Sequence, residues 1–170
     1  RFEKSNTFFE ELSEEEKAEE LINIRNGFNF ARKVAATGEC DVLILDEVLG
    51  IIDQNIITLE DVEKLARTFQ QMKLGGDNTV GITTTSDLYG GYNSSWGLDT
   101  IFSYYDAYPG VWLEKNGAPV YGSTQPEVKN ALSTLRRWYA EGILDREFAV
   151  RDESARQSLI GKGQCGMYFG

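Results

Sequence analysis

The hydrophobic and polar positions of the chain begin with a helical pattern. Apolar residues recur every three or four positions after an S-x-x-E capping box, formed by Ser13 and Glu16. Gly38 suits the left-handed position at which many helices end. We therefore predict a helix between Ser13 and Gly38. Its apolar face would consist of Leu21, Ile24, Phe28, Ala31 and Ala35.

A strand and a second helix are predicted next. Residues 42–45 (VLIL) form a short continuous apolar run, which is typical of a central parallel strand buried on both faces. Thr58 then caps a helix that reaches Lys73, with an apolar stripe at Val62, Leu65, Ala66 and Phe69. Residues 75–78 (GGDN) predict a turn, and residues 80–83 (VGIT) predict a short strand.

The remainder of the chain alternates loops, helices and a hairpin. We predict a loop over residues 86–95, a helix near residues 98–105, and a hairpin over residues 111–122 around Asn116-Gly117. Pro126 opens a helix that ends at Gly142, followed by a short helix in DESARQSLIGKG and a strand in CGMYF. The helix after Pro126 is expected to pack through Val128, Leu132, Leu135 and Tyr139. This order of helices and strands predicts an α/β fold.

Composition narrows the classes of function. The 170 residues include 27 acidic and 17 basic side chains, which give a formal net charge of −10. Nucleic-acid binding is disfavoured, because phosphates are neutralised by clusters of Lys and Arg. The chain has no His, so it has no imidazole for base catalysis or metal binding. Its two cysteines, Cys40 and Cys165, lack C-x-x-C spacing and are expected to be free thiols, although a disulfide stays possible.

Paired acids follow the first predicted strand. Asp46 and Glu47 come directly after VLIL, which is the form of a Walker B element. A parallel strand delivers its last residues to the edge of the sheet where ligands bind, and carboxylates there can hold Mg²⁺. The alternative is that Asp46 caps the next helix and Glu47 is exposed in its first turn. The pattern alone leaves both interpretations open.

Residues 1–65, and ECDVLILDEVLGIID most specifically, resemble the ATP:corrinoid adenosyltransferases. The resemblance implies a RecA-like P-loop fold, a cytoplasmic enzyme, and Mg-ATP as cofactor, with Asp46 and Glu47 at the metal site. That family carries a G-x-x-x-x-G-K-[ST] loop, which these 170 residues lack. Without this cradle for the triphosphate we expect no adenosyl transfer by this chain.

Aromatic residues gather in the middle of the chain. Eight of them lie between Tyr89 and Trp112, interleaved with glycines. The apolar faces of sugar rings stack on aromatic planes, so this composition favours saccharide binding. The alternative is that most of these rings belong to the core. As ligand-binding residues we select Tyr92, Trp96, Tyr108 and Trp112.

Residues 59–170 resemble the family 1 extracellular solute-binding proteins of ABC transporters, through a hairpin, a P-E-V helix, EGILD and GKGQCGMYFG in that order. The resemblance implies part of a periplasmic-binding-protein type II fold, which closes on a sugar and delivers it to permease subunits. It implies no cofactor and an extracellular or membrane-anchored location.

The two resemblances favour a fusion of two fragments, with a single undescribed α/β domain as the alternative. We predict an adenosyltransferase-like segment at residues 1–58 and a solute-binding segment at residues 59–170, joined in the manner of a fusion. Carbohydrate capture is the favoured function, and corrinoid adenosyl transfer is the alternative. The chain begins at Arg1 and stops after a strand, so both ends look cut. Incomplete cores would leave apolar edges exposed, so we also expect self-association.

Overall fold

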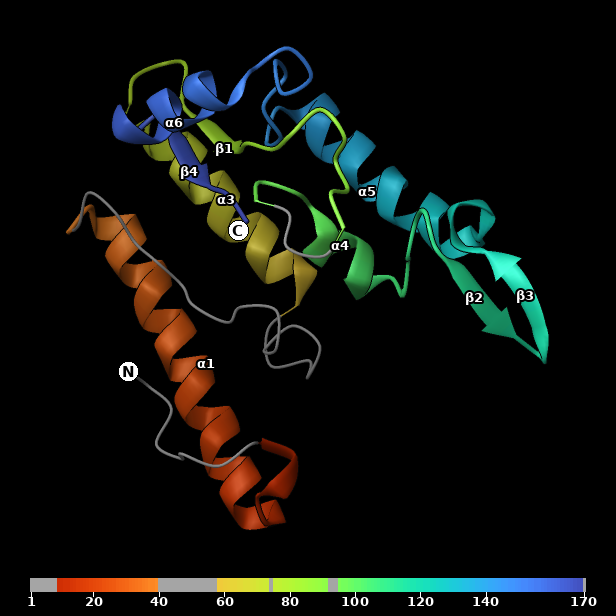
Figure 1. Ribbon diagram of the computed structural model, residues 1–170. Helices are drawn as coiled ribbons and strands as arrows, with labels where there is room; N and C mark the ends of the chain where they lie inside the picture. The colour runs from red at the N-terminus through yellow and green to blue at the C-terminus, as the bar shows by residue number, and fades with distance from the viewer. Residues whose placement is uncertain (1–8, 40–57, 74, 92–94, 170) are drawn as a thin grey trace. The chain divides into compact units, whose positions relative to one another are not determined.

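The computed structural model describes residues 9–39, 58–73, 75–91 and 95–169. It consists of two units, which comprise residues 1–65 and 66–170 and are treated separately below (Figure 1). The division falls inside one helix, between Leu65 and Ala66. The strand predicted at residues 42–45 lies outside the described residues.

The first unit contains a single-turn 3₁₀ helix, η1 (Phe9–Glu11), and the long helix α1 (Glu14–Thr37). The predicted capping box is present: the Ser13 N–H donates to Glu16 Oε2 at 2.9 Å, and the Glu16 N–H donates to Ser13 Oγ at 3.3 Å. Gly38 ends the helix with a φ of 67°. Both predicted boundaries of α1 are thus confirmed. On the predicted apolar face, Phe28, Ala31 and Ala35 are buried, whereas Leu21 and Ile24 are half-buried.

Helix α3 (Leu59–Met72) contains the boundary between the units. Its start is set by Thr58 and Asp61, because the Asp61 N–H donates to Thr58 Oγ1 at 3.2 Å and the Thr58 N–H donates to Asp61 Oδ2 at 3.1 Å. Partial burial raises the pKa of the Asp61 carboxyl, but the hydrogen bonds from Thr58 outweigh it, so the pKa is lowered overall. The predicted helix is therefore confirmed, and its buried stripe includes Val62, Leu65 and Ala66.

A small parallel sheet forms the centre of the second unit. Strand β1 (Val80–Ile82) pairs with β4 (Cys165–Met167), with Val80 opposite Cys165 and Ile82 opposite Met167. Leu144 adds a parallel bridge to Ile82. The mixed α/β class predicted from the sequence is confirmed.

Two glycines allow α3 to approach this sheet closely. A Cβ added to Gly166 would lie 2.3 Å from Phe69 Cβ, and one added to Gly81 would lie 3.0 Å from the Ala66 carbonyl oxygen. The backbone of β4 therefore packs directly against the Phe69 side chain of α3, and there is no room for a methyl group at Gly166.

The remaining helices and the hairpin follow the predicted order. They are α4 (Asp99–Tyr104), β2 (Trp112–Lys115), β3 (Ala118–Tyr121), η2 (Gly122–Thr124), α5 (Pro126–Glu141) and α6 (Glu153–Gly161). The hairpin turns at Asn116 and Gly117, both with positive φ, and pairs Trp112 with Tyr121. Gly142 ends α5 with a φ of 76°.

The predicted buried face of α5 is wrong in part. Val128 and Leu135 are buried, but Leu132 and Tyr139 are each 43% exposed. Their places in the core are taken by two residues, each one position earlier, Ala131 and the fully buried Trp138. The buried positions still follow helical spacing, so the predicted helical period is correct. The prediction is wrong only in which of two neighbouring apolar residues is buried.

Candidate functional site

The carboxyl ends of β1 and β4 meet at one edge of the second unit. Because the two strands are parallel, the residues that follow each of them lie at the same edge, where α/β proteins bind ligands. Thr83 and Thr84 follow β1 and are fully buried, and Tyr168 follows β4 and is 49% exposed. This edge is the candidate site.

Trp96 is fixed at this edge by three hydrogen bonds. Its N–H donates to the Phe169 carbonyl at 2.9 Å, and its own carbonyl accepts from the Thr84 hydroxyl at 2.8 Å and the Thr85 N–H at 3.2 Å. Trp96 has a φ of 73°, which is uncommon for a bulky residue. The bonds on both sides of the residue hold it in this conformation.

Three side chains meet here, and we refer to Trp96, Tyr168 and Arg156 as the Trp96 cluster. The Trp96 and Tyr168 rings are stacked, with centroids 4.5 Å apart and planes at 29°. The guanidinium carbon of Arg156, from α6, lies 5.8 Å from the centre of the Trp96 ring. Trp96 itself is half-buried, so Tyr168 offers the larger free ring surface.

The preceding loop is anchored to the start of α4. The Asp99 carboxylate accepts hydrogen bonds from the Gly90 N–H at 3.2 Å and the Gly91 N–H at 2.7 Å. Tyr89 packs edge-on against Phe102 with centroids 5.2 Å apart. Burial, together with the nearby Asp99 charge, raises the pKa of the Tyr89 hydroxyl. Tyr89 is therefore a packing residue, in line with the core interpretation of the aromatic segment.

Only part of the predicted site can be compared with the structure. Tyr92, Asp46 and Glu47 lie outside the described residues. Trp96 lies in the cluster just described. Tyr108 and Trp112 do not join it: Trp112 is 71% exposed on the hairpin, which extends away from β1 and β4, and its ring is 5.4 Å from that of Tyr121 (Figure 1).

Two members of the Trp96 cluster are absent from the sequence-based prediction. Tyr168 lies near the end of the strand predicted in CGMYF, so its position close to the carboxyl edge of the sheet was available as a signal. Arg156 gave no such signal, because its contact with Trp96 joins residues 60 positions apart in the chain.

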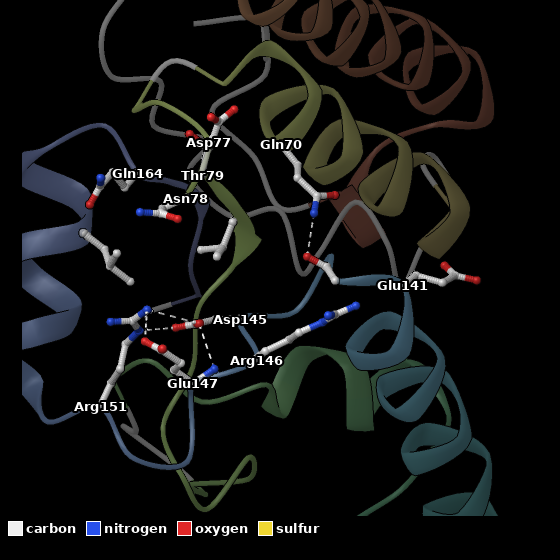
Figure 2. Close-up of a pocket in the computed structure, with 13 residues that line it drawn as sticks. Gln70, Asp77, Asn78, Thr79, Glu141, Asp145, Arg146, Glu147, Arg151 and Gln164 are labelled. Atoms are coloured by element: carbon white, nitrogen blue, oxygen red, sulfur yellow. Dashed lines mark hydrogen bonds and ion pairs between the residues drawn. The ribbon is translucent and has the colours of Figure 1, made fainter.

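A separate pocket of about 520 Å³ lies beside β1 and is lined by polar side chains (Figure 2). Its most buried group is Asp145, at 1% exposure. The carboxylate accepts from Arg151 Nε at 2.5 Å, from the Glu147 N–H at 3.0 Å and from Thr83 Oγ1 at 3.3 Å. The hydrogen bond to Asp145 raises the pKa of Arg151.

Several other polar groups of this pocket are also engaged within the protein. Gln70 donates to the Gly142 carbonyl at 2.7 Å, Gln164 donates to the Gly75 carbonyl at 3.1 Å, and Glu141 pairs with Arg67. No aromatic side chain lines the pocket. We interpret it as a structural polar network, since saccharide sites combine aromatic planes with free polar groups.

Within the described ranges, no group of three or more His, Cys, Asp or Glu side chains could hold a metal ion. None of the helices in those ranges is both long and apolar enough to span a membrane.

Comparison with known proteins gives two kinds of match. Residues 1–74 match the model of the family described as ATP:corrinoid adenosyltransferase BtuR/CobO/CobP, which covers less than half of the chain. No solved structure matches the chain.

Two proteins of Bacillus subtilis (strain 168) are similar to a longer stretch. One is the polygalacturonan/rhamnogalacturonan-binding protein YtcQ, with 27% identity over 117 residues, and the other is lipoprotein LipO, with 26% identity over 113 residues. These matches cover 66% and 65% of this chain but only 22% of each relative, so the chain spans about a fifth of their length.

The two kinds of match cannot be disjoint. A segment of 74 residues and two thirds of a 170-residue chain must share residues. The chain therefore combines a segment similar to corrinoid adenosyltransferases with a longer, overlapping segment similar to these two Bacillus subtilis proteins.

Proposed function

We propose that residues 59–170 are part of a carbohydrate-binding protein that captures an oligosaccharide for an ABC transporter. The observation that carries this proposal is the stacked pair of Trp96 and Tyr168 at the carboxyl edge of the parallel strands. Trp96 is held by its backbone, and Tyr168 presents a ring that is half free for a sugar face.

The relatives support a ligand and a location of this kind. One is named for binding the polysaccharides polygalacturonan and rhamnogalacturonan, and the other is named a lipoprotein. An extracellular or membrane-anchored protein that works with permease subunits, and needs no cofactor, follows from this proposal. Tyr92, which lies outside the described residues, and Tyr108 and Trp112, which do not join the Trp96 cluster, stay predicted ligand contacts.

Calorimetric titration with a panel of oligosaccharides tests the proposal. We expect heat of binding with the 170-residue chain, and a loss of affinity of about 10-fold or more in Tyr168→Ala, because the sugar loses its stacking partner. Tyr139→Ala is the matched control, since Tyr139 is similarly exposed (43%) and packs against Phe148, outside the Trp96 cluster. Absence of heat across neutral and acidic sugars would contradict the proposal.

A second candidate function comes from the match of residues 1–74 to corrinoid adenosyltransferases. The residues present do not fit Mg-ATP, because the 170 residues contain no P-loop to hold the triphosphate. We therefore derive no reaction step for this segment. The alternative is that the chain is a cytoplasmic protein related to that family, with Asp46 and Glu47 as ligands of Mg²⁺. The affinity for Mg-ATP, measured by titration of the wild-type chain and of Asp46→Ala, tests this role. Equal affinities would exclude the role.

A further inference from the structure

Arg156 is a buried cation without an ionic partner among the described residues. Only 9% of the residue is exposed, and it forms no ion pair within the described ranges. One of its terminal nitrogens donates to the Arg151 carbonyl at 2.6 Å, but its Nε is buried and has no acceptor. A buried charge of this kind is costly unless it is paired, so the site is incomplete as it stands.

The carboxylates near Arg156 in the chain are committed elsewhere. Asp152 caps α6 by accepting from the Ala155 N–H at 2.8 Å, and Glu153 accepts from Gln157 at 3.2 Å. The buried Asp145 is paired with Arg151. Among the described residues, Arg156 therefore has no counter-charge, and it lies next to an aromatic pair that could hold a ring.

The guanidinium of Arg156 lies against the Trp96 ring. The guanidinium lies 5.8 Å from the ring centre, within the range of a cation–π contact. Tyr168, stacked on the same Trp96 ring, is the exposed partner. A planar guanidinium can also form a forked pair with a carboxylate. A sugar ring that stacks on Tyr168 and carries a carboxylate would supply the acceptor that Arg156 lacks.

We propose that Arg156 selects uronic-acid saccharides, by pairing with a ring carboxylate of a sugar stacked on Tyr168. This inference rests on the proposed carbohydrate-binding function and adds the residue and the charge that define the ligand class. It also accounts for a basic group at the candidate site of a chain with a net charge of −10.

The test compares trigalacturonic acid with its methyl ester, which has the same rings and no charge, by calorimetric titration of the 170-residue chain. We expect the acid to bind about 10- to 100-fold more tightly at low salt, as for a hydrogen bond to a charged group. In Arg156→Gln this preference should disappear, while affinity for the ester stays within about 3-fold. Arg146→Gln, which removes an exposed charge that donates to the Ala140 carbonyl, should keep the preference.

The possible results separate this inference from the proposed function. Equal affinity of the wild-type chain for acid and ester, or a preference that survives in Arg156→Gln, overturns the role of Arg156 and leaves carbohydrate binding intact. Failure of the wild-type chain to bind either sugar overturns both. If Arg156→Gln does not fold, as judged by circular dichroism, the ratio of wild-type affinities for acid and ester decides the question.

Discussion

At the scale of single residues, Asp145 and Arg151 show how the second unit accommodates a buried charge. The Asp145 side chain is 2% exposed and that of Arg151 is 21% exposed, and Arg151 also pairs with Glu147 at 2.7 Å. Hydrogen bonds from Thr83 and the Glu147 backbone satisfy more of the carboxylate. The network joins the end of β1 to the segment that leads to α6. It therefore helps to position α6, which carries Arg156.

Removal of Arg151 should destabilise this unit strongly. Arg151→Ala leaves Asp145 buried without a cation, and we expect the free energy of unfolding to fall by about 3 kcal/mol. Urea denaturation measures the change. Lys73→Ala is the control, since its pair with Asp77 is exposed on both sides and its loss should change the stability far less. Equal losses in the two variants would contradict the structural role of Asp145.

The Cys165 thiol should react slowly in the folded chain. Burial raises its pKa to about 11, from an ordinary value of 9.0, so at pH 8 its thiolate is about 100-fold rarer than that of an exposed thiol. Alkylation by iodoacetamide at pH 8, in a Cys40→Ser background, should therefore be about 100-fold slower in buffer than in urea. Similar rates would show that the thiol is not buried.

The same raised pKa predicts a dependence of stability on pH. The folded state holds the Cys165 proton more tightly than the unfolded state does, so the contribution is complete below pH 9. It is lost as the pH rises from about 9 to about 11. Urea midpoints at pH 8 and pH 10 measure the loss, and Cys165→Ala should remove the part that belongs to this thiol.

At the scale of elements, the contact between β4 and α3 depends on the absence of a side chain at Gly166. A methyl group there would lie 2.3 Å from Phe69 Cβ, so Gly166→Ala should lower the free energy of unfolding by about 1–3 kcal/mol through overpacking. Thermal unfolding provides the measurement. Gly161→Ala, at the end of α6 with open space around it, should be neutral or stabilising by up to about 1 kcal/mol.

The elements that the sequence predicted well are those with local signals. The capping box at Ser13, the Thr58 cap, the Asn116-Gly117 turn and the Gly142 stop each act within a few residues, and each is present in the structure. Side-chain partners were harder to predict. The burial of Trp138 in place of Tyr139, and the meeting of Trp96 with Tyr168 and Arg156, depend on segments distant in the chain, which no local pattern encodes.

At the scale of the whole molecule, the exposed apolar side chains favour self-association. Val150 is 83% exposed, Trp112 is 71% exposed, and Ile22 on α1 is 62% exposed. We expect the sedimentation coefficient of the chain to rise with concentration in the micromolar range, because contacts between such groups bury apolar surface. A sharp two-state melt of a strictly monomeric chain would contradict this expectation.

The fusion-like origin of the chain stays our interpretation of the two overlapping matches. The domain boundary that we predict after residue 58 also stays a prediction. Sequencing of the flanking DNA would test both: a P-loop upstream favours the adenosyltransferase as parent, and a second lobe downstream favours the sugar-binding protein.

The division between Leu65 and Ala66 has a practical consequence for dissecting the chain. A cut there would leave each half with about two turns of a 14-residue helix, too short to be stable in water without packing. The N-terminal fragment would lose the part of α3 that follows Leu65. The C-terminal fragment would lose the part that precedes Ala66, together with the Thr58 cap. Fragments for separate study therefore have to overlap, with Thr58–Met72 duplicated in both.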